Sequence, residues 1–134
     1  MDETSNDTLI KKAVSVINSQ KIGEYTVGDV GCALVTDKGN VYVGVCIDAP
    51  SGTGFCAEAS AIAAMVTAGE TKIKKIVAVW KDGEEIYVVT PCGRCREFIS
   101  FFDKDNLNTE IILSNTESVR LSDLLPHYHK YNKI

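Results

Sequence analysis

The segment CAEASAIAAMVTAG, residues 56–69, constrains the fold more than any other stretch of the chain. It is rich in alanine and apolar on nearly all sides, and Gly69 can end it as a helix C-terminal cap. A helix without a polar face must be covered on more than one side. The segment therefore predicts a buried helix inside a layered domain.

Short apolar segments rich in β-branched residues supply the cover for that helix. The turn sequences TDKGN and KDGEE join two pairs of them and predict β-hairpins. Further helices are expected from caps at residues 5–7 to about Ser19, and from the N-cap Thr90 to about Phe102. This order predicts an α/β fold, a three-layer α/β/α sandwich with a mixed sheet of about five strands. The expected strands span residues 31–36, 41–47, 75–80, 86–90 and 110–114.

Length and charge exclude several classes of protein. We expect residues 1–134 to form one domain, because they contain no repeat or low-complexity tract. No apolar run approaches the roughly 18 residues of a membrane span. A formal charge of -4 and the lack of a basic block argue against nucleic-acid binding. The polar start MDETSNDT argues against a secretory signal, and five cysteines, an odd number, are expected to stay reduced, so we expect a cytoplasmic protein.

Three cysteines stand at the starts of two expected helices. Cys92 and Cys95 form a C-x-x-C pair, which suits a redox couple, half of a structural zinc site or two ligands of a catalytic zinc. Cys56 opens the buried helix, and the unpaired N–H groups of a helix start favour thiolates. The two histidines, His127 and His129, lack a suitable ligand spacing. We therefore expect the three cysteines to bind one Zn²⁺ per chain and to leave one position open for water.

Glu58 is the only charged residue between Asp48 and Glu70. An unpaired buried carboxylate is costly, so Glu58 either faces solvent at the positive helix start or faces a polar site. Beside three cysteines it is placed to serve a zinc-bound water. Three thiolates around a dication leave a charge of -1, and the cations available to tune the metal are Arg94 and Arg96. The same sequence is also expected if both arginines lie on the exposed side of a short helix and have no role at the metal.

Cys-Ala-Glu at 56–58, followed by Pro-Cys-x-x-Cys at 91–95, resembles the signature of the cytidine deaminase family of zinc-dependent deaminases. The similarity covers roughly residues 8–131, including the hairpin YTVGDVGCALVTDKGNVYVGV and the segment DLLPHYH. It implies the cytidine deaminase fold and an aminohydrolase that converts a cytosine base to a uracil-type product with release of ammonia. By this resemblance Glu58 is the general acid/base.

The resemblance also implies contacts with a cytosine nucleoside. Asp48 stands where the family has a glutamate that holds the ribose, whereas the accompanying asparagine is Cys46 and an aromatic residue near the sugar is Gly28. The Ala57 N–H would orient the base carbonyl, and a carbonyl near Thr90 would accept from the exocyclic amine. These departures bring the chain closer to blasticidin S deaminase, a relative that acts on a cytosine nucleoside antibiotic. Cytidine, deoxycytidine and blasticidin S are the expected substrates.

The C-terminal sequence HYHKY carries the last expected site residues. In the family an aromatic residue after Leu-Leu-Pro closes on the base, often from a neighbouring subunit. His129 and Tyr131 are the candidates here, and they imply a homotetramer. The more frequent role of such residues is to cover the edge of the core.

Other functions compete with this hypothesis. A catalytically silent structural-zinc or nucleoside-binding module would need a fourth ligand, such as Cys32 or Cys46. A redox protein would form a reversible disulfide between Cys92 and Cys95 and would leave Cys56 without a role. Editing of polynucleotides is disfavoured by the acidic charge.

Overall fold

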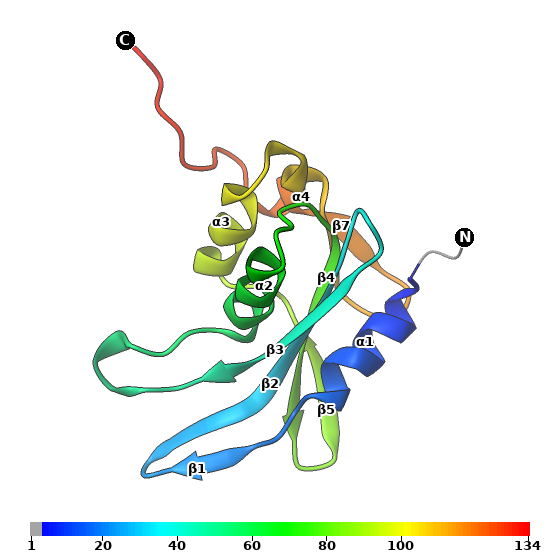
Figure 1. The fold of residues 1–134 in the computed structure, drawn as a ribbon, viewed down its shortest axis with the longest axis vertical. Coiled ribbons are helices and arrows are strands. Elements are labelled where there is room, and N and C mark those ends of the chain that lie inside the picture. The colour runs from blue at the N-terminus through cyan, green and yellow to red at the C-terminus, as the bar shows by residue number, and fades with distance from the viewer. Residues whose placement is uncertain (1–3) are drawn as a thin grey trace.

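The computed structural model describes residues 4–134, so the first three residues of the predicted domain lie outside the described residues. A mixed sheet lies between helix α1 on one face and helices α2 and α3 on the other (Figure 1). The helices are α1 Asn6–Ser15, α2 Ala57–Thr67, α3 Gly93–Phe101 and α4 Leu121–Leu124, with short 3-10 helices η1 Pro50–Gly52 and η2 Lys104–Asn108. None of the helices within residues 4–134 has the length and apolar character needed to cross a membrane.

Seven strands form the sheet in the described part of the chain. The long central strands β2 and β4 pair antiparallel, and β4 with β6 is the parallel pair. The strands are β1 Gln20–Ile22, β2 Tyr25–Thr36, β3 Val41–Ile47, β4 Ile73–Asp82, β5 Glu85–Val89, β6 Glu110–Ile112 and β7 Ser118–Arg120. The three-layer α/β/α architecture is confirmed. The predicted number of about five strands was wrong, because β1 and β7 are short and mostly exposed, and so lack the apolar run that marks the equally short β6.

Two helix boundaries also differ from the prediction. Helix α1 ends at Ser15 rather than near Ser19, because the backbone N–H of Asn18 donates to the carbonyl of Gly28 in β2, at 2.9 Å. Helix α3 begins after an N-cap at Cys92, not Thr90, since the chain stays extended through Cys92. Tertiary hydrogen bonds decide the first boundary, and local propensity cannot foresee them.

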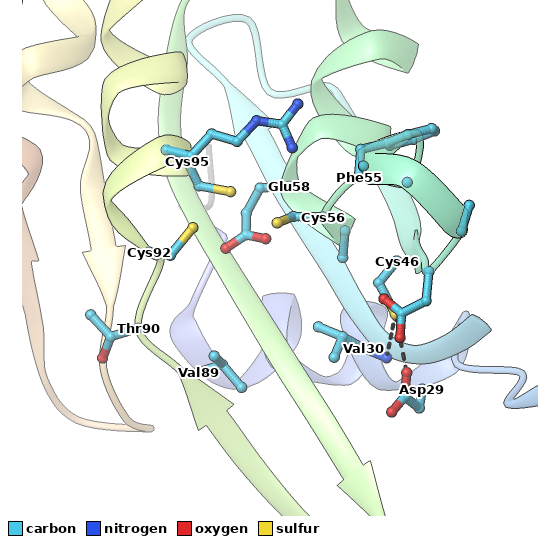
Figure 2. Close-up of a pocket in the computed structure, with 16 residues that line it drawn as sticks. Asp29, Val30, Cys46, Phe55, Cys56, Glu58, Val89, Thr90, Cys92 and Cys95 are labelled. Atoms are coloured by element: carbon cyan, nitrogen blue, oxygen red, sulfur yellow. Dashed lines mark hydrogen bonds between the residues drawn. The ribbon is translucent and has the colours of Figure 1, made fainter. Parts of the chain in front are cut away.

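Alternate side chains of the central strands build two cores. Cys32 and Leu34 of β2 pack with α2 and α3, whereas Ala33 and Val35 pack with α1. This alternation follows from the period of two in a β-strand, and it explains why the central strands are apolar on both faces. The sheet thereby fixes α2 and α3 on the same face, with their N-terminal ends close together (Figures 1 and 2).

Helix α2 lies unusually close to β3. A Cβ atom built on Gly44 would stand 2.4 Å from the Cβ of Ser60, so only glycine fits there. The Ser60 hydroxyl donates to the carbonyl of Val45 at 2.7 Å and ties the helix to the strand. This close packing sets the height of the α2 start above the sheet.

Candidate metal centre

Three cysteine sulfur atoms meet where α2 and α3 begin. Cys56 is the N-cap of α2, Cys92 is the N-cap of α3, and Cys95 lies in the first turn of α3. Their Sγ atoms all lie within 4.8 Å of one another. The Cys56 thiol makes no side-chain capping hydrogen bond to the start of α2. Figure 2 shows the three sulfur atoms grouped around the Glu58 carboxylate.

The protonation of the three thiols follows from their surroundings. Hydrogen bonding from the backbone N–H of Cys95 lowers the pKa of Cys92, as expected for a helix N-terminus. Burial raises the pKa of Cys56 and of Cys95, and the charge of Glu58 raises both further. Two of the three thiols therefore resist ionisation until a cation is present to neutralise them.

The cluster fits zinc better than a disulfide or a closed structural site. Tetrahedral Zn²⁺ with sulfur ligands at about 2.3 Å places the sulfur atoms about 3.8 Å apart, within the separation seen here. Within residues 4–134 no further histidine, cysteine or carboxylate joins the three sulfur atoms as a metal-binding group. Cys32 is buried in the core, and the Cys46 thiol donates to Asp29. The cluster can thus hold one ion and leave one coordination position open.

Glu58 lies in the first turn of α2 and is only 6% exposed. The solvent-facing alternative for this residue is therefore wrong, because the side chain points into the space beside the sulfur atoms (Figure 2). Burial raises its pKa, although its own backbone N–H and the Cys95 thiol oppose that effect. A carboxyl group that ionises less readily than usual suits proton transfer near neutral pH.

A cavity of about 520 Å³ opens over the cysteine cluster. It brings together Asp48, Ala57, Thr90 and Arg94, four of the residues predicted to contact substrate or to tune the metal. The Ala57 N–H is at the first position of α2 and points out of the helix start, where it has no partner within the helix. The cavity is lined by Asp29, Val30, Cys46, Asp48, Ala49, Gly52, Gly54, Phe55, Cys56, Ala57, Glu58, Val89, Thr90, Cys92, Arg94 and Cys95.

Three predicted site residues lie outside this cavity. Arg96 donates from Nε to the carbonyl of Pro91 at 2.8 Å and from Nη1 to the carbonyl of Leu124 at 3.1 Å. It therefore ties α3 to α4. His129 and Tyr131 belong to the C-terminal segment, where their rings contact each other edge to face and Tyr131 is 92% exposed.

Asp29 is the main cavity residue that the sequence analysis missed. It follows Gly28, where β2 bulges against β3 between Val27 and Gly31. A charged side chain in the otherwise apolar segment VGDVGCALV was the available signal. The bulge that turns Asp29 toward the cavity has no such signature.

Comparison with known proteins agrees with this geometry. Residues 3–109 match the model of the cytidine and deoxycytidylate deaminase zinc-binding region, which covers Cys56, Glu58, Cys92 and Cys95. The chain therefore belongs to the family of cytidine and deoxycytidylate deaminases.

Relatives by sequence include two deaminases. A blasticidin-S deaminase from Bacillus cereus is 42% identical over 82 residues, which are 57% of this chain and 59% of that protein. A cytidine deaminase from Mycobacterium tuberculosis is 30% identical over 99 residues, 72% of this chain and 69% of that protein. The matched region thus spans less than two thirds of the blasticidin-S deaminase.

A solved structure extends the similarity over nearly the whole fold. A point mutant of cytidine deaminase from Mycobacterium tuberculosis superposes with a TM-score of 0.79 at 25% identity. The superposition covers 96% of this chain and 100% of that chain. The α/β arrangement seen here is therefore that of a cytidine deaminase.

Proposed function

We propose that this chain hydrolyses the exocyclic amine of a cytosine base carried on a sugar, with one zinc ion held by Cys56, Cys92 and Cys95. The observation that carries the proposal is the buried carboxylate of Glu58 beside three sulfur atoms, inside a cavity large enough for a nucleoside. Cytidine, deoxycytidine and blasticidin S are the candidate substrates, since relatives are named for cytidine and for blasticidin S. The products are ammonia and the uracil-type compound.

Zinc, when bound, supplies the positive charge that makes a water molecule acidic at neutral pH. Glu58 accepts a proton from that water as its oxygen bonds to C4 of the pyrimidine. Glu58 then delivers that proton to N3. It takes the second proton from the hydroxyl now on C4 and passes it to the amine, which leaves as ammonia as the C4–N bond breaks and the C4 carbonyl forms. The buried position of Glu58 keeps bulk water from competing for this proton.

The remaining cavity residues would position the substrate. We assign the Ala57 N–H to the base carbonyl, the carbonyl beside Thr90 to the exocyclic amine and Asp48 to the sugar. Arg94 would offset the -1 charge of a zinc ion with three thiolates. Support comes from their common place in the cavity lining. The contacts that Arg96 makes with backbone carbonyls favour a structural role for it instead.

The direct test replaces Glu58 by glutamine. Glu58→Gln preserves the size of the side chain but cannot accept the proton, so it should keep one zinc per chain and lose ammonia release by about 10²–10⁴-fold. Cys92→Ala should instead lose zinc, whereas Cys46→Ala, a cysteine of the same cavity outside the cluster, should keep it. Zinc content by elemental analysis and ammonia release from cytidine, deoxycytidine, blasticidin S and free cytosine are the measurements. Full turnover by Glu58→Gln would rule out this mechanism.

We also propose that the protein acts as a homotetramer in which His129 or Tyr131 reaches a neighbouring subunit. The C-terminal segment extends away from the body of the fold (Figure 1), and Tyr131 is the exposed aromatic side chain it carries. Truncation after Pro126 should lower kcat while zinc content stays unchanged. Light scattering that shows a fully active monomer would contradict the proposal.

A cytoplasmic location and a single domain over residues 1–134 complete the proposal. All five cysteines are free, and a reducing compartment preserves a thiol metal site. The superposition with the cytidine deaminase covers 96% of this chain and the whole of that chain, which favours one catalytic unit.

A further inference from the structure

Asn106 is a fully buried polar residue in the 3-10 helix η2, which connects α3 to β6. A buried amide group without partners is costly, so the hydrogen bonds of Asn106 show what it holds in place. Its backbone N–H donates to the carbonyl of Asp103 at 3.0 Å, and its carbonyl accepts from the N–H of Thr109 at 3.1 Å. These backbone bonds stay within the segment around η2, whereas the side chain bonds to other parts of the chain.

The side chain of Asn106 joins three separate segments. Its Oδ1 accepts from the backbone N–H of Ile73 at the start of β4, at 2.9 Å. Its Nδ2 donates to the carbonyl of Thr71 at 2.9 Å and to the carbonyl of Ile99 in α3 at 3.0 Å. Both amide hydrogens are therefore used, and neither an ionised aspartate nor a leucine of similar size could supply them.

The two bonds from Nδ2 connect the C-terminal ends of α3 and α2. Ile99 lies in the last turn of α3, where a carbonyl has no partner within the helix, so Asn106 caps this end. Thr71 directly follows Glu70, whose backbone N–H donates to the carbonyl of Met65 in α2 at 3.1 Å. One side chain thus relates the far ends of the two helices whose first residues carry the cysteine cluster.

The length of α3 converts a small tilt at Ile99 into a large displacement of the cysteines. Cys92 lies about two helical turns from Ile99, or about 10 Å at about 1.5 Å per residue. A tilt of about 6° around the Ile99 end would therefore move Cys92 by about 1 Å relative to Cys56. Distances between a metal and its ligands tolerate only about 0.2 Å, so a tilt of this size would weaken zinc binding.

We propose that Asn106 is a positioning residue for the metal centre, which fixes the tilt of α3 and thereby the distance of Cys92 and Cys95 from Cys56. Asn106 acts through the backbone of α3 and contacts neither the metal nor the substrate. This inference rests on the zinc site of the proposed function and does not depend on the reaction that the site performs.

The test compares two buried polar side chains of the same segment. Asn106→Leu keeps a side chain of similar size and removes the three side-chain hydrogen bonds. The matched control is Thr109→Val, because Thr109 is 1% exposed and its hydroxyl donates to the carbonyl of Ile73 in β4, at 2.7 Å, rather than to α3. Both variants should lower Tm, by about 4–12 °C, since each leaves buried backbone groups without a partner.

Only the Asn106 variant should also change the metal centre. Zinc release from the loaded protein to an excess of a chelator should be about 10–100-fold faster for Asn106→Leu than for the parent, whereas Thr109→Val should release zinc at the parent's rate. The visible absorption spectrum of the Co²⁺-loaded protein should shift for Asn106→Leu alone, because the positions of the ligands set this spectrum. A residue that merely stabilised the fold would lower Tm without either change.

Zinc release from Asn106→Leu at the parent's rate, or an equal acceleration by Thr109→Val, would overturn the proposal. If Asn106→Leu does not fold, Asn106→Ala replaces it, because the space it leaves admits a water molecule to the freed backbone groups but does not restore the direct bond to Ile99. Release at the parent's rate would overturn the proposal there too.

Failure of the proposed function has a different signature. Neither zinc release nor the Co²⁺ spectrum requires a substrate, so a parent protein that binds zinc but releases no ammonia would refute the proposed reaction and leave this test in force. A parent protein that binds no zinc would overturn both proposals.

Discussion

Replacing Gly44 by alanine should displace the helix that carries the site. The added Cβ would stand 2.4 Å from the Cβ of Ser60 and 2.5 Å from the backbone nitrogen of Ala61. These atoms belong to helix α2 and cannot turn aside as a flexible side chain would. Since an ordinary Cβ contact begins near 3.4 Å, α2 has to move away from β3 by about 1 Å.

Two magnitudes follow from this displacement. Overpacking of a well-filled core costs about 1–3 kcal/mol of unfolding free energy, which corresponds to a fall in Tm of roughly 4–12 °C for a chain of this size. Because Cys56 and Glu58 stand at the start of α2, the shift also misplaces Glu58, the proposed general acid/base, relative to Cys92 and Cys95. A misplacement of 1 Å costs about 10²-fold in turnover.

Thermal unfolding followed by circular dichroism and ammonia release from the preferred nucleoside measure the two effects. Gly93→Ala is the matched control: it also adds a Cβ to a glycine, yet no heavy atom lies within 4 Å of the added carbon. It should unfold within about 2 °C of the parent protein, in line with the small effect of substitutions that meet no neighbour. If Gly44→Ala behaves like Gly93→Ala, α2 does not pack on β3 as described.

Three charged residues give further predictions. A hydrogen bond from Tyr42 lowers the pKa of Glu70, so this carboxylate stabilises the fold fully above its unfolded pKa near 4.5 and loses that contribution as the pH falls through the lower folded pKa. Urea unfolding of the parent and of Glu70→Gln should differ at neutral pH and converge as the pH falls from 4.5 through the lowered folded pKa. Glu24→Gln, on an exposed turn, should match the parent throughout, and a difference for Glu70→Gln that does not change with pH would refute this. Arg94→Gln should keep one zinc and lose about 10–100-fold in kcat/KM, and loss of zinc instead would refute its tuning role. Arg96→Gln should keep kcat/KM near that of the parent but lose about 1–3 kcal/mol of unfolding free energy, because its guanidinium bonds to two backbone carbonyls disappear; unchanged urea unfolding would refute this.

The cysteine cluster was predictable because its geometry is local. A helix start orients its first residues in a fixed way, so the short spacing of Cys92 and Cys95 already places two sulfur atoms together. The third sulfur required that two helices begin side by side on one face of the sheet. The order of strands and helices predicted the layers, and the family signature linked Cys56 to the pair.

The parts that sequence could not predict depend on contacts between distant segments. Strand β1 exists because the chain after α1 pairs with β2, and the same pairing ends α1 at Ser15. Strand β7 has two exposed residues out of three and pairs with β6. Neither segment is apolar enough to be recognised as a strand from its sequence, so both follow from the tertiary fold.

Glu58 and Asp29 line the same cavity, but only the position of Glu58 could be predicted from the sequence. Each is a carboxylate in an apolar element, but only Glu58 was singled out from the sequence. Glu58 follows a metal ligand by two residues on a helix, so its direction is set by helix geometry. Asp29 faces the cavity only because a left-handed glycine bends β2, and its partners Cys46 and Trp80 come from two other strands. The carboxylate beside the cysteine cluster therefore follows from a local motif, whereas the carboxylate at the other side of the cavity depends on the three-dimensional structure.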